Sequence, residues 1–420
     1  MRTFKWKRLF LVILVGFLFY ILPITAAGEP VPEPQFSGDT LVFYPDIKPG
    51  EIRYFYIYFN EDDTGDIPEP AYPTNLRYTY DASGKKHLLT NGLLSIEIPE
   101  ETNAGISYMN VKGMSTENVA SPWIARAFVA AWKRQWSVES TISINYKFSP
   151  VKILQKGPLA IVLLSEILLE PIGVRWERTY FFFNKGNYCL LRDAYLPPSS
   201  LEESISMYEK MNTRVLLGNV EDMLTAYEHF PKQMYKDIPN SADIKEEWGN
   251  AGSWLCRYNP KIQEYFGIAF KQKAAARTIC TWSTYNENQI KVINFNNFIQ
   301  RDKPTIRDRW FIAGKGGYED VKNFAQKINE PLAYIVEKVE QKGERKDWWD
   351  NDTKDNYIWN YRVKIMLKNY LDVDYREPFF IGIKDIFGNR KVNLKSLRLV
   401  VPEVKDDETV GKEIPFQIFR

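Results

Sequence analysis

The stretch Val138–Phe148 (VESTISINYKF) decides the fold class, because its apolar and polar side chains alternate with a period of two. Its apolar positions are Val138, Ile142, Ile144, Tyr146 and Phe148. A helix would repeat its apolar positions every three to four residues, so this stretch predicts a β-strand with one buried face. The stretch Ile52–Phe59 (IRYFYIYF) is β-branched and aromatic, and it follows a KPG turn signal at residues 48–50. It predicts a second strand.

The same patterns continue along the chain. Further strands are predicted at Leu94–Ile98, Leu159–Leu169, Val174–Phe183, Gln263–Phe270, Gln289–Phe295 and Arg309–Ala313. Helices are predicted only at Leu201–Met211, Tyr318–Ile328 and Leu332–Gln341. Many short strands separated by turns favour antiparallel sandwiches over a parallel α/β sheet. We therefore expect a mainly β protein, with a large antiparallel β-sandwich and few helices.

The composition excludes several classes of function. The 55 basic and 53 acidic residues leave a net charge of +2, so no basic surface field points to nucleic acid. The chain contains two histidines, His87 and His229, and three cysteines without metal-ligand spacing. It has no phosphate-binding loop and no His-Glu-x-x-His pattern. We expect no metal, no cofactor and no nucleic-acid partner.

Residues 1–27 have the pattern of an export segment. Four basic residues lie within the first eight positions, and an uncharged run from Leu9 to Gly28 follows. This pattern fits a secretory signal cut after Ala27, and it equally fits a retained single-pass anchor of about 20 residues. Either way we expect the membrane as a partner and an extracytoplasmic body, anchored or secreted. Residues 28–39 (GEPVPEPQFSGD) form a Pro-rich spacer.

We expect four further segments after the spacer. Residues 40–90 hold N-terminal strands, residues 91–341 a large β-sandwich body, residues 342–355 a charged linker, and residues 356–420 a small β-sandwich. The linker contains Asn351 in an Asn-x-Thr sequon, a candidate glycosylation site on an exposed loop.

A resemblance to a known family rests on several of these stretches. The large segment resembles the β-supersandwich of galactose-mutarotase-like carbohydrate proteins at NGLLSIEIP (from Asn91), Arg175–Tyr180 and Arg309–Asn329. RVKIMLKNYL (from Arg362) and YPDIKPGEIRYFYIYFNE (from Tyr44) resemble their small immunoglobulin-like modules. In such modules a segment like Lys412–Phe419 usually leads into a segment like Phe43–Asn60, and here the order of these two pieces is reversed. This order leads to two hypotheses: the N-terminal strands complete the C-terminal module, or the chain is one part of a longer reading frame.

The sequence offers few candidates for chemistry. A lyase or epimerase on such a sandwich would need a base beside a cation, which points to Tyr227 and His229 with Arg178 or Arg257. Trp123, Arg126, Trp132 and Trp136 suit an aromatic and basic surface for glycans, and the alternative is that these tryptophans anchor a sheet or a short amphipathic element. Cys256 and Cys280 either form a disulfide or remain free buried thiols.

Two function hypotheses follow. The first is an exported cell-surface protein that binds glycans, packs with other surface proteins or has a structural role. The alternative is a carbohydrate-active enzyme, a lyase, epimerase or glycosidase, which the resemblance implies.

Overall fold

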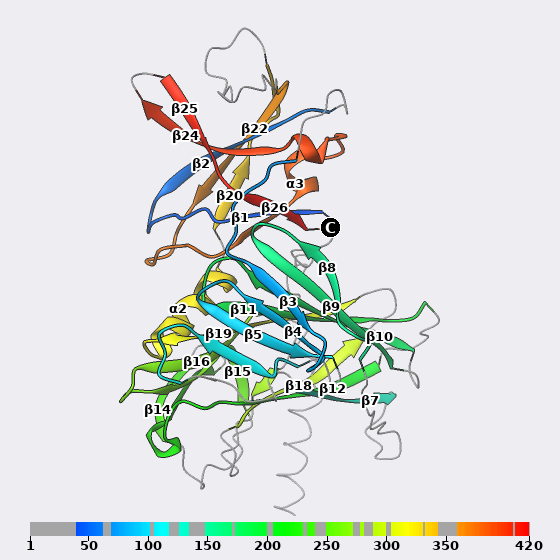
Figure 1. Cartoon of the computed structure of the whole chain (residues 1–420), viewed down its shortest axis with the longest axis vertical. Helices are drawn as coiled ribbons and strands as arrows, with labels where there is room; N and C mark the ends of the chain where they lie inside the picture. Colours follow the sequence, from blue (N-terminus) through cyan, green and yellow to red (C-terminus); the bar gives the residue numbers. More distant parts are fainter. Residues whose placement is uncertain are drawn as a thin grey trace, which may run out of the picture. The chain divides into compact units, whose positions relative to one another are not determined.

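The computed structural model describes most of the chain between Asp39 and Phe419 (Figure 1). The described ranges are 39–61, 69–100, 105–116, 126–133, 148–169, 173–199, 205–229, 233–239, 249–271, 278–280, 289–299, 304–330, 332–342, 359–405 and 408–419. Four antiparallel sheets and a few short helices make up these ranges, which confirms a mainly β fold.

The largest sheet has 13 strands. They are β7 Arg126–Lys133, β8 Lys152–Lys156, β9 Ala160–Leu169, β10 Val174–Phe183, β11 Tyr188–Leu196, β12 Ile205–Arg214, β13 Leu224–His229, β14 Gln233–Pro239, β15 Gly249–Asn259, β16 Glu264–Phe270, β17 Thr278–Cys280, β18 Gln289–Ile299 and β19 Thr305–Lys315. Its main path runs β7-β12-β18-β17-β15-β16-β19-β11-β10-β9-β8, and the hairpin β13–β14 joins it at β15.

Side-chain alternation gives this sheet two buried faces. On β10, Trp176, Tyr180 and Phe182 enter one hydrophobic core, whereas Phe181 and Phe183 enter another. We call these the Trp176 face and the Phe181 face. A strand buried on both faces has few polar positions, which explains the nearly continuous apolar run that β9 shows in the sequence.

A four-stranded sheet packs on the Trp176 face (Figure 1). It contains β3 Arg77–Asp81, β4 Lys86–Thr90, β5 Leu94–Pro99 and β6 Tyr108–Val111. The turn before β5 is fixed by Asn91, whose Oδ1 accepts hydrogen bonds from the backbone N–H groups of Leu93 and Leu94 at 2.9 and 2.7 Å. Its Nδ2 donates to the carbonyls of Phe183 and Gly186 in the large sheet. The Asn-Gly turn therefore ties the two sheets together.

Helix α2 (Tyr318–Asn329) packs on the Phe181 face. Its buried residues Val321, Phe324 and Ala325 face the sheet. Gly267 on β16 permits this approach, because a Cβ at that position would lie 2.4 Å from the side chain of Val321. The predicted helix at Tyr318–Ile328 is confirmed.

The remaining strands form a second, smaller sandwich. One sheet contains β2 Ile52–Phe59, β20 Ala333–Val336, β21 Glu340–Gln341, β22 Tyr361–Lys368, β24 Arg398–Lys405 and β25 Glu408–Glu413. The other contains β1 Thr40–Phe43, β23 Phe379–Gly382 and β26 Phe416–Phe419. The short helices α3 (Ile383–Phe387), η3 (Leu394–Ser396) and η2 (Val220–Asp222) lie in loops, the first two in this sandwich and η2 just before β13.

Strands from the two ends of the sequence alternate in the small sandwich. β2 lies between β22 and β24, and β1 lies between β23 and β26. Leu41 and Phe43 of β1 point into the core between the two sheets, whereas Val42 joins the core of the Phe181 face. The three-stranded sheet therefore contributes to both sandwiches. Residues 77–90 lie apart from this group, because β4 pairs with β5.

Two predicted helices are wrong. Ile205–Arg214 is strand β12, paired with β7 and β18, where a helix was predicted over Leu201–Met211. Leu332–Gln341 contains β20 and β21, both paired with β22. In both segments the helical signals were local, whereas pairing with strands distant in the sequence decides the conformation. The other predicted strands are confirmed within a few residues, except Val138–Phe148, of which only Phe148 lies within the described residues.

Three expectations concern segments outside the described residues. These are the export segment and most of its spacer, the linker with Asn351, and Trp123 with Trp136. In the part of the chain that the structure describes, no helix combines the length and the apolarity needed to cross a bilayer.

Candidate functional site

An exposed row of aromatic and basic side chains lies on the outer face of the small sandwich. The strand period of two explains it: Phe55, Ile57 and Phe59 of β2 enter the core, so the tyrosines between them point outward. We call this surface the tyrosine face. It is formed by Ile52, Tyr54 and Tyr56 of β2, Lys364, Met366 and Lys368 of β22, Ile335 of β20, and Tyr370 just beyond β22.

Cations lie over the tyrosine rings of this face. The ammonium of Lys364 lies 4.5 Å from the ring centre of Tyr54, and that of Lys368 lies 4.3 Å from the ring centre of Tyr370. Lys364 also forms an ion pair with Glu337 at 2.8 Å. The hydrogen bond to Glu337 raises the pKa of Lys364, so its ammonium stays charged.

The rings nevertheless remain accessible. Tyr54 is 39% exposed and Tyr370 is 70% exposed, and Ile52 and Ile335 beside them are also exposed. Towards the other end of β2 the face closes, because Tyr58 packs with Trp359 and Val400. Flat aromatic faces next to hydrogen-bond donors can hold a sugar ring, whose C–H groups contact the ring while its oxygens accept hydrogen bonds. The tyrosine face can therefore bind a ligand but offers no enclosed reaction chamber.

A buried ionic cluster lies on the Trp176 face of the large sheet. The carboxylate of Asp193 accepts hydrogen bonds from Nε and Nη2 of Arg178 at 2.8 and 3.1 Å, and from Nε1 of Trp176 at 2.8 Å. Arg309 on β19 also donates to it. These charged side chains are almost completely buried. Such pairing is what allows charges to remain in an apolar interior.

The side chains of this cluster keep one another ionised. Burial would raise the pKa of Asp193, but the two guanidiniums and the Trp176 hydrogen bond outweigh it and hold that pKa below its usual value. Burial opposes the charge of Arg178, and Asp193 reverses that effect and raises the pKa of Arg178. An Asp193 that stays ionised cannot serve as a proton donor. Arg178, a predicted catalytic partner, is held in this cluster by Asp193.

A second buried carboxylate, Glu264, lies on the same face but far away. It accepts hydrogen bonds from the backbone of Ser115 and the hydroxyl of Thr116. Asp193 pairs with Arg307 of the shared neighbour strand β19, and Glu264 pairs with Lys315 of the same strand. The two carboxylates are therefore about eight residues, or roughly 26 Å, apart along the direction of β19. Paired carboxylates that cleave a glycosidic bond lie within about 9.5 Å of each other. These two do not form such a pair.

The structure brings some of the residues predicted for acid–base chemistry onto neighbouring strands and leaves Arg178 apart from them. Tyr227 is buried on β13, with its ring stacked on Tyr235 at 5.1 Å. His229 ends the same strand beyond a register shift. Five strand spacings, roughly 24 Å, separate β13 from Arg178 on β10. Of the two predicted cations, Arg257 lies close to Tyr227, since its strand β15 pairs directly with β13.

The predicted tryptophan surface is only partly within the described residues. Arg126 and Trp132 belong to β7, whose backbone pairs with β12. Trp123 and Trp136 lie outside the described residues. Glycan binding by this segment remains a prediction.

The predicted disulfide does not occur in the described structure. Cys256 is a free, buried thiol. Cys280 pairs with Gly249, about seven residues from Cys256 along β15, which corresponds to roughly 23 Å. Disulfides need Cα atoms within about 7 Å of each other, so the strand register excludes the bond. Among the described residues, no cluster of three or more His, Cys, Asp or Glu side chains is suited to a metal ion.

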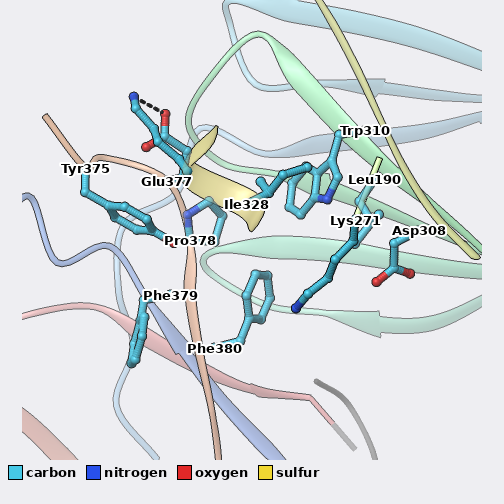
Figure 2. A pocket seen from close by; sticks show the side chains of 11 residues that line it. Leu190, Lys271, Asp308, Trp310, Ile328, Tyr375, Glu377, Pro378, Phe379 and Phe380 are labelled. Atoms are coloured by element: carbon cyan, nitrogen blue, oxygen red, sulfur yellow. Dashed lines mark hydrogen bonds and ion pairs between the residues drawn. The ribbon is translucent and has the colours of Figure 1, made fainter. Parts of the chain in front are cut away.

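A small pocket lies between the end of α2, the large sheet and β23 (Figure 2). Trp310, Ile328 and Phe380 line it, and Lys327 forms an ion pair with Glu377 at its margin, at 2.9 Å. Its volume of about 20 Å³ has room for roughly one water molecule. The pocket is therefore too small for a sugar ring.

The tyrosine face was not among the predicted sites, although its signal is present in the sequence. In IRYFYIYF, Tyr54, Tyr56 and Tyr58 share one parity, and Phe55, Ile57 and Phe59 share the other. The phenylalanine and isoleucine side fits a core, so the tyrosine side must point outward. What the sequence could not show is that the basic residues of β22 lie beside these tyrosines.

No protein-family model and no curated protein sequence matches this chain. Solved structures with similar arrangements include a TPR-domain containing protein from Parabacteroides distasonis, with 9% identity, 63% of this chain and 55% of that chain covered, and a TM-score of 0.39. A GH36 α-galactosidase from Geobacillus stearothermophilus has 10% identity, covers 58% of this chain and 42% of its own, and has a TM-score of 0.42.

A putative aldose 1-epimerase from Escherichia coli K12 is also similar, with 8% identity, 55% of this chain and 99% of that chain covered, and a TM-score of 0.35. This chain spans about half the length of the first two structures.

Proposed function

We propose that this chain is an extracytoplasmic glycan-binding protein and that the tyrosine face is its binding surface. The observation that carries the proposal is the exposure of Tyr54 and Tyr370, each with a lysine ammonium over its ring. Exposed aromatic rings on a rigid sheet favour ligand binding, because the rings lose little conformational freedom when a ligand arrives.

The chemistry of the face suits sugars in two ways. Tyr54, Ile52 and Ile335 give an apolar platform, which matches the C–H face of a pyranose ring. Lys368 at the end of β22 brings three N–H donors, which match hydroxyl or carboxylate oxygens. Because Lys364 is already paired with Glu337, Lys368 is the cation best placed to favour glycans with acidic groups.

The extracytoplasmic location rests on the sequence of residues 1–27. The basic start and the apolar run after it support export as an anchored or a secreted protein. The mass of the mature N-terminus in membrane and medium fractions tests this point. A mature protein that starts at Met1 in a soluble cytosolic fraction contradicts export.

Binding is tested with the purified full chain on an array of neutral and acidic glycans. The double variant Tyr54→Ala/Tyr370→Ala is expected to bind at least tenfold more weakly than the unchanged protein. Tyr80→Ala is the matched control, since Tyr80 is 41% exposed but lies on β3 in another sheet. Equal losses in both variants, or no binding to any glycan, contradict the proposal.

The same glycans are then incubated with the protein and assayed for new reducing ends. Asp193 and Glu264 lie too far apart to cleave a sugar together, so we expect no release. Release that survives the double variant at the tyrosine face supports the enzyme alternative and places its site elsewhere.

A further inference from the structure

Arg257 is a fully buried cation in the large sheet. It lies on β15 between Thr225 of β13 and Phe266 of β16, and its exposed fraction is 0%. The strand period places it on the Trp176 face with Leu255, two residues away. Its neighbours in the core of that face are mostly aliphatic and aromatic. The exception by register is Glu264, diagonal to Arg257 on β16, whose carboxylate accepts hydrogen bonds from Ser115 and Thr116 and forms none with Arg257.

The guanidinium of Arg257 has no partner in the part of the chain that the structure describes. None of Nε, Nη1 and Nη2 makes a hydrogen bond. Arg178 and Arg309 on the same face differ, because they share the carboxylate of Asp193. Burial alone lowers the pKa of Arg257 to about 10, so the side chain is still charged at neutral pH.

A lone buried charge is costly to a fold. Desolvation of an ion in a protein interior has a penalty of several kcal/mol unless a partner compensates it. Apolar residues of similar size would avoid this penalty at a core position between Thr225 and Phe266. A buried arginine whose guanidinium nitrogens donate no hydrogen bond is therefore suited to bind an anion that comes from outside the chain.

We infer that Arg257 is the anchor of a binding site for the carboxylate group of a small molecule, and this inference is independent of the tyrosine face. The planar fork of a guanidinium binds a carboxylate through two parallel hydrogen bonds, and all of its nitrogens are open here. The charges also match, since one carboxylate neutralises one guanidinium. A phosphate monoester carries about −1.5 to −2 at neutral pH and would leave excess buried negative charge.

The surroundings suggest how such a ligand is held. Thr225 lies directly opposite Arg257, and Tyr227, stacked on Tyr235, lies on the diagonal position of the same face. Among the described strands β14 pairs only with β13, so the edge of the sheet is about two strand spacings, roughly 10 Å, from Arg257. The ligand would approach from this edge, beside Tyr235.

The test measures thermal unfolding of the full chain in sodium acetate, sodium glucuronate, sodium phosphate or sodium chloride at equal ionic strength. We expect the Tm of the unchanged chain to rise saturably with acetate and glucuronate, beyond the rise in Arg257→Met. Phosphate raises Tm by exclusion from the protein surface, so its effect should be equal in the two proteins. In Arg257→Met the saturable rise disappears, and in Arg257→Lys the apparent affinity falls severalfold because the fork is lost. Arg175→Met is the matched control on β10, where the arginine side chain is exposed, and it keeps the rise.

The variants also report on the free protein. Without added carboxylate, Arg257→Met is expected to melt at or above the Tm of the unchanged chain, since a lone buried charge has been removed. An Arg257→Met protein that fails to fold, or melts well below the unchanged chain, shows that the folded chain itself supplies a partner, and overturns the proposal. Equal Tm rises with acetate in Arg257→Met and the unchanged chain, or a rise with phosphate that depends on Arg257 as strongly as the rise with acetate, also overturn it.

Discussion

Replacing Asp193 by Asn removes one buried negative charge while keeping the size of the side chain. Asp193 accepts hydrogen bonds from Arg178, Arg309 and Trp176, and it is fully buried. The asparagine variant leaves two guanidiniums in an apolar interior without the carboxylate that balances them. Loss of one partner from a buried ion pair costs about 3–5 kcal/mol in unfolding free energy. We expect Asp193→Asn to fall within this range.

The matched control breaks an exposed ion pair on a nearby strand. Glu166→Gln removes the 3.1 Å contact with Lys152, whose side chain is 60% exposed. Exposed pairs contribute about 0–1 kcal/mol, so this variant should unfold almost as the unchanged protein does. Urea titrations followed by tryptophan fluorescence and far-UV circular dichroism give both values. A loss below about 1 kcal/mol in Asp193→Asn, or equal losses in the two variants, would refute the argument.

Three further predictions concern other parts of the fold. Burial lowers the pKa of His87 below its usual 6.5, against the opposing effect of Glu100, so the unfolded chain binds the proton more tightly. Stability should then fall as the pH drops below about 6.5, and His87→Gln should lose part of the difference between urea titrations at about pH 7.5 and about pH 5.5. Burial raises the pKa of the Cys256 thiol, so iodoacetamide should modify Cys256 only in urea. Peptide mass spectrometry measures the modification, and equally fast modification of the native protein contradicts the prediction. Gly267→Ala should cost about 1–3 kcal/mol through its clash with Val321, and a second change, Val321→Ala, should recover part of the loss; no recovery in urea titrations argues against that contact.

The elements that can be predicted from the sequence are those whose apolar pattern lies within one short segment and whose patterned side chains are buried on one face or on both. Helix α2 was found because Val321, Phe324 and Ala325 recur at helical spacing after a Gly-Gly turn. The bounds of β10 follow from VRWERTYFFF, which is rich in aromatic and β-branched residues. In both cases the side chains that define the pattern are also those that are buried.

The sequence failed where distant partners decide the conformation. The segment predicted as a helix begins with the acidic residues Glu202 and Glu203 and shows no strict alternation, yet residues 205–214 pair with β7 and β18, both far away in the chain. The tyrosine face has the same origin, because Lys364 meets Tyr54 only through the register of β2 and β22. The sequence names Arg257 as a candidate cation beside Tyr227 and His229, but a lone arginine in a strand gives no sign that its guanidinium is buried without a hydrogen-bond partner. Such features depend on pairings that a single sequence does not encode locally.

Because early and late strands alternate in the small sandwich, this sandwich cannot fold until almost the whole chain has been synthesised. Asn360 donates its backbone N–H to the side chain of Asn60, a contact across 300 residues. At about 5–20 residues per second, a ribosome needs roughly 15–60 s to supply β22 after β2 has been made. During that interval β2 (IRYFYIYF) has no partner strand on either edge. It is aromatic and carries only one charge, that of Arg53, so it is prone to aggregate. A chaperone that shields residues 52–59 until synthesis nears completion would therefore govern the yield of folded protein.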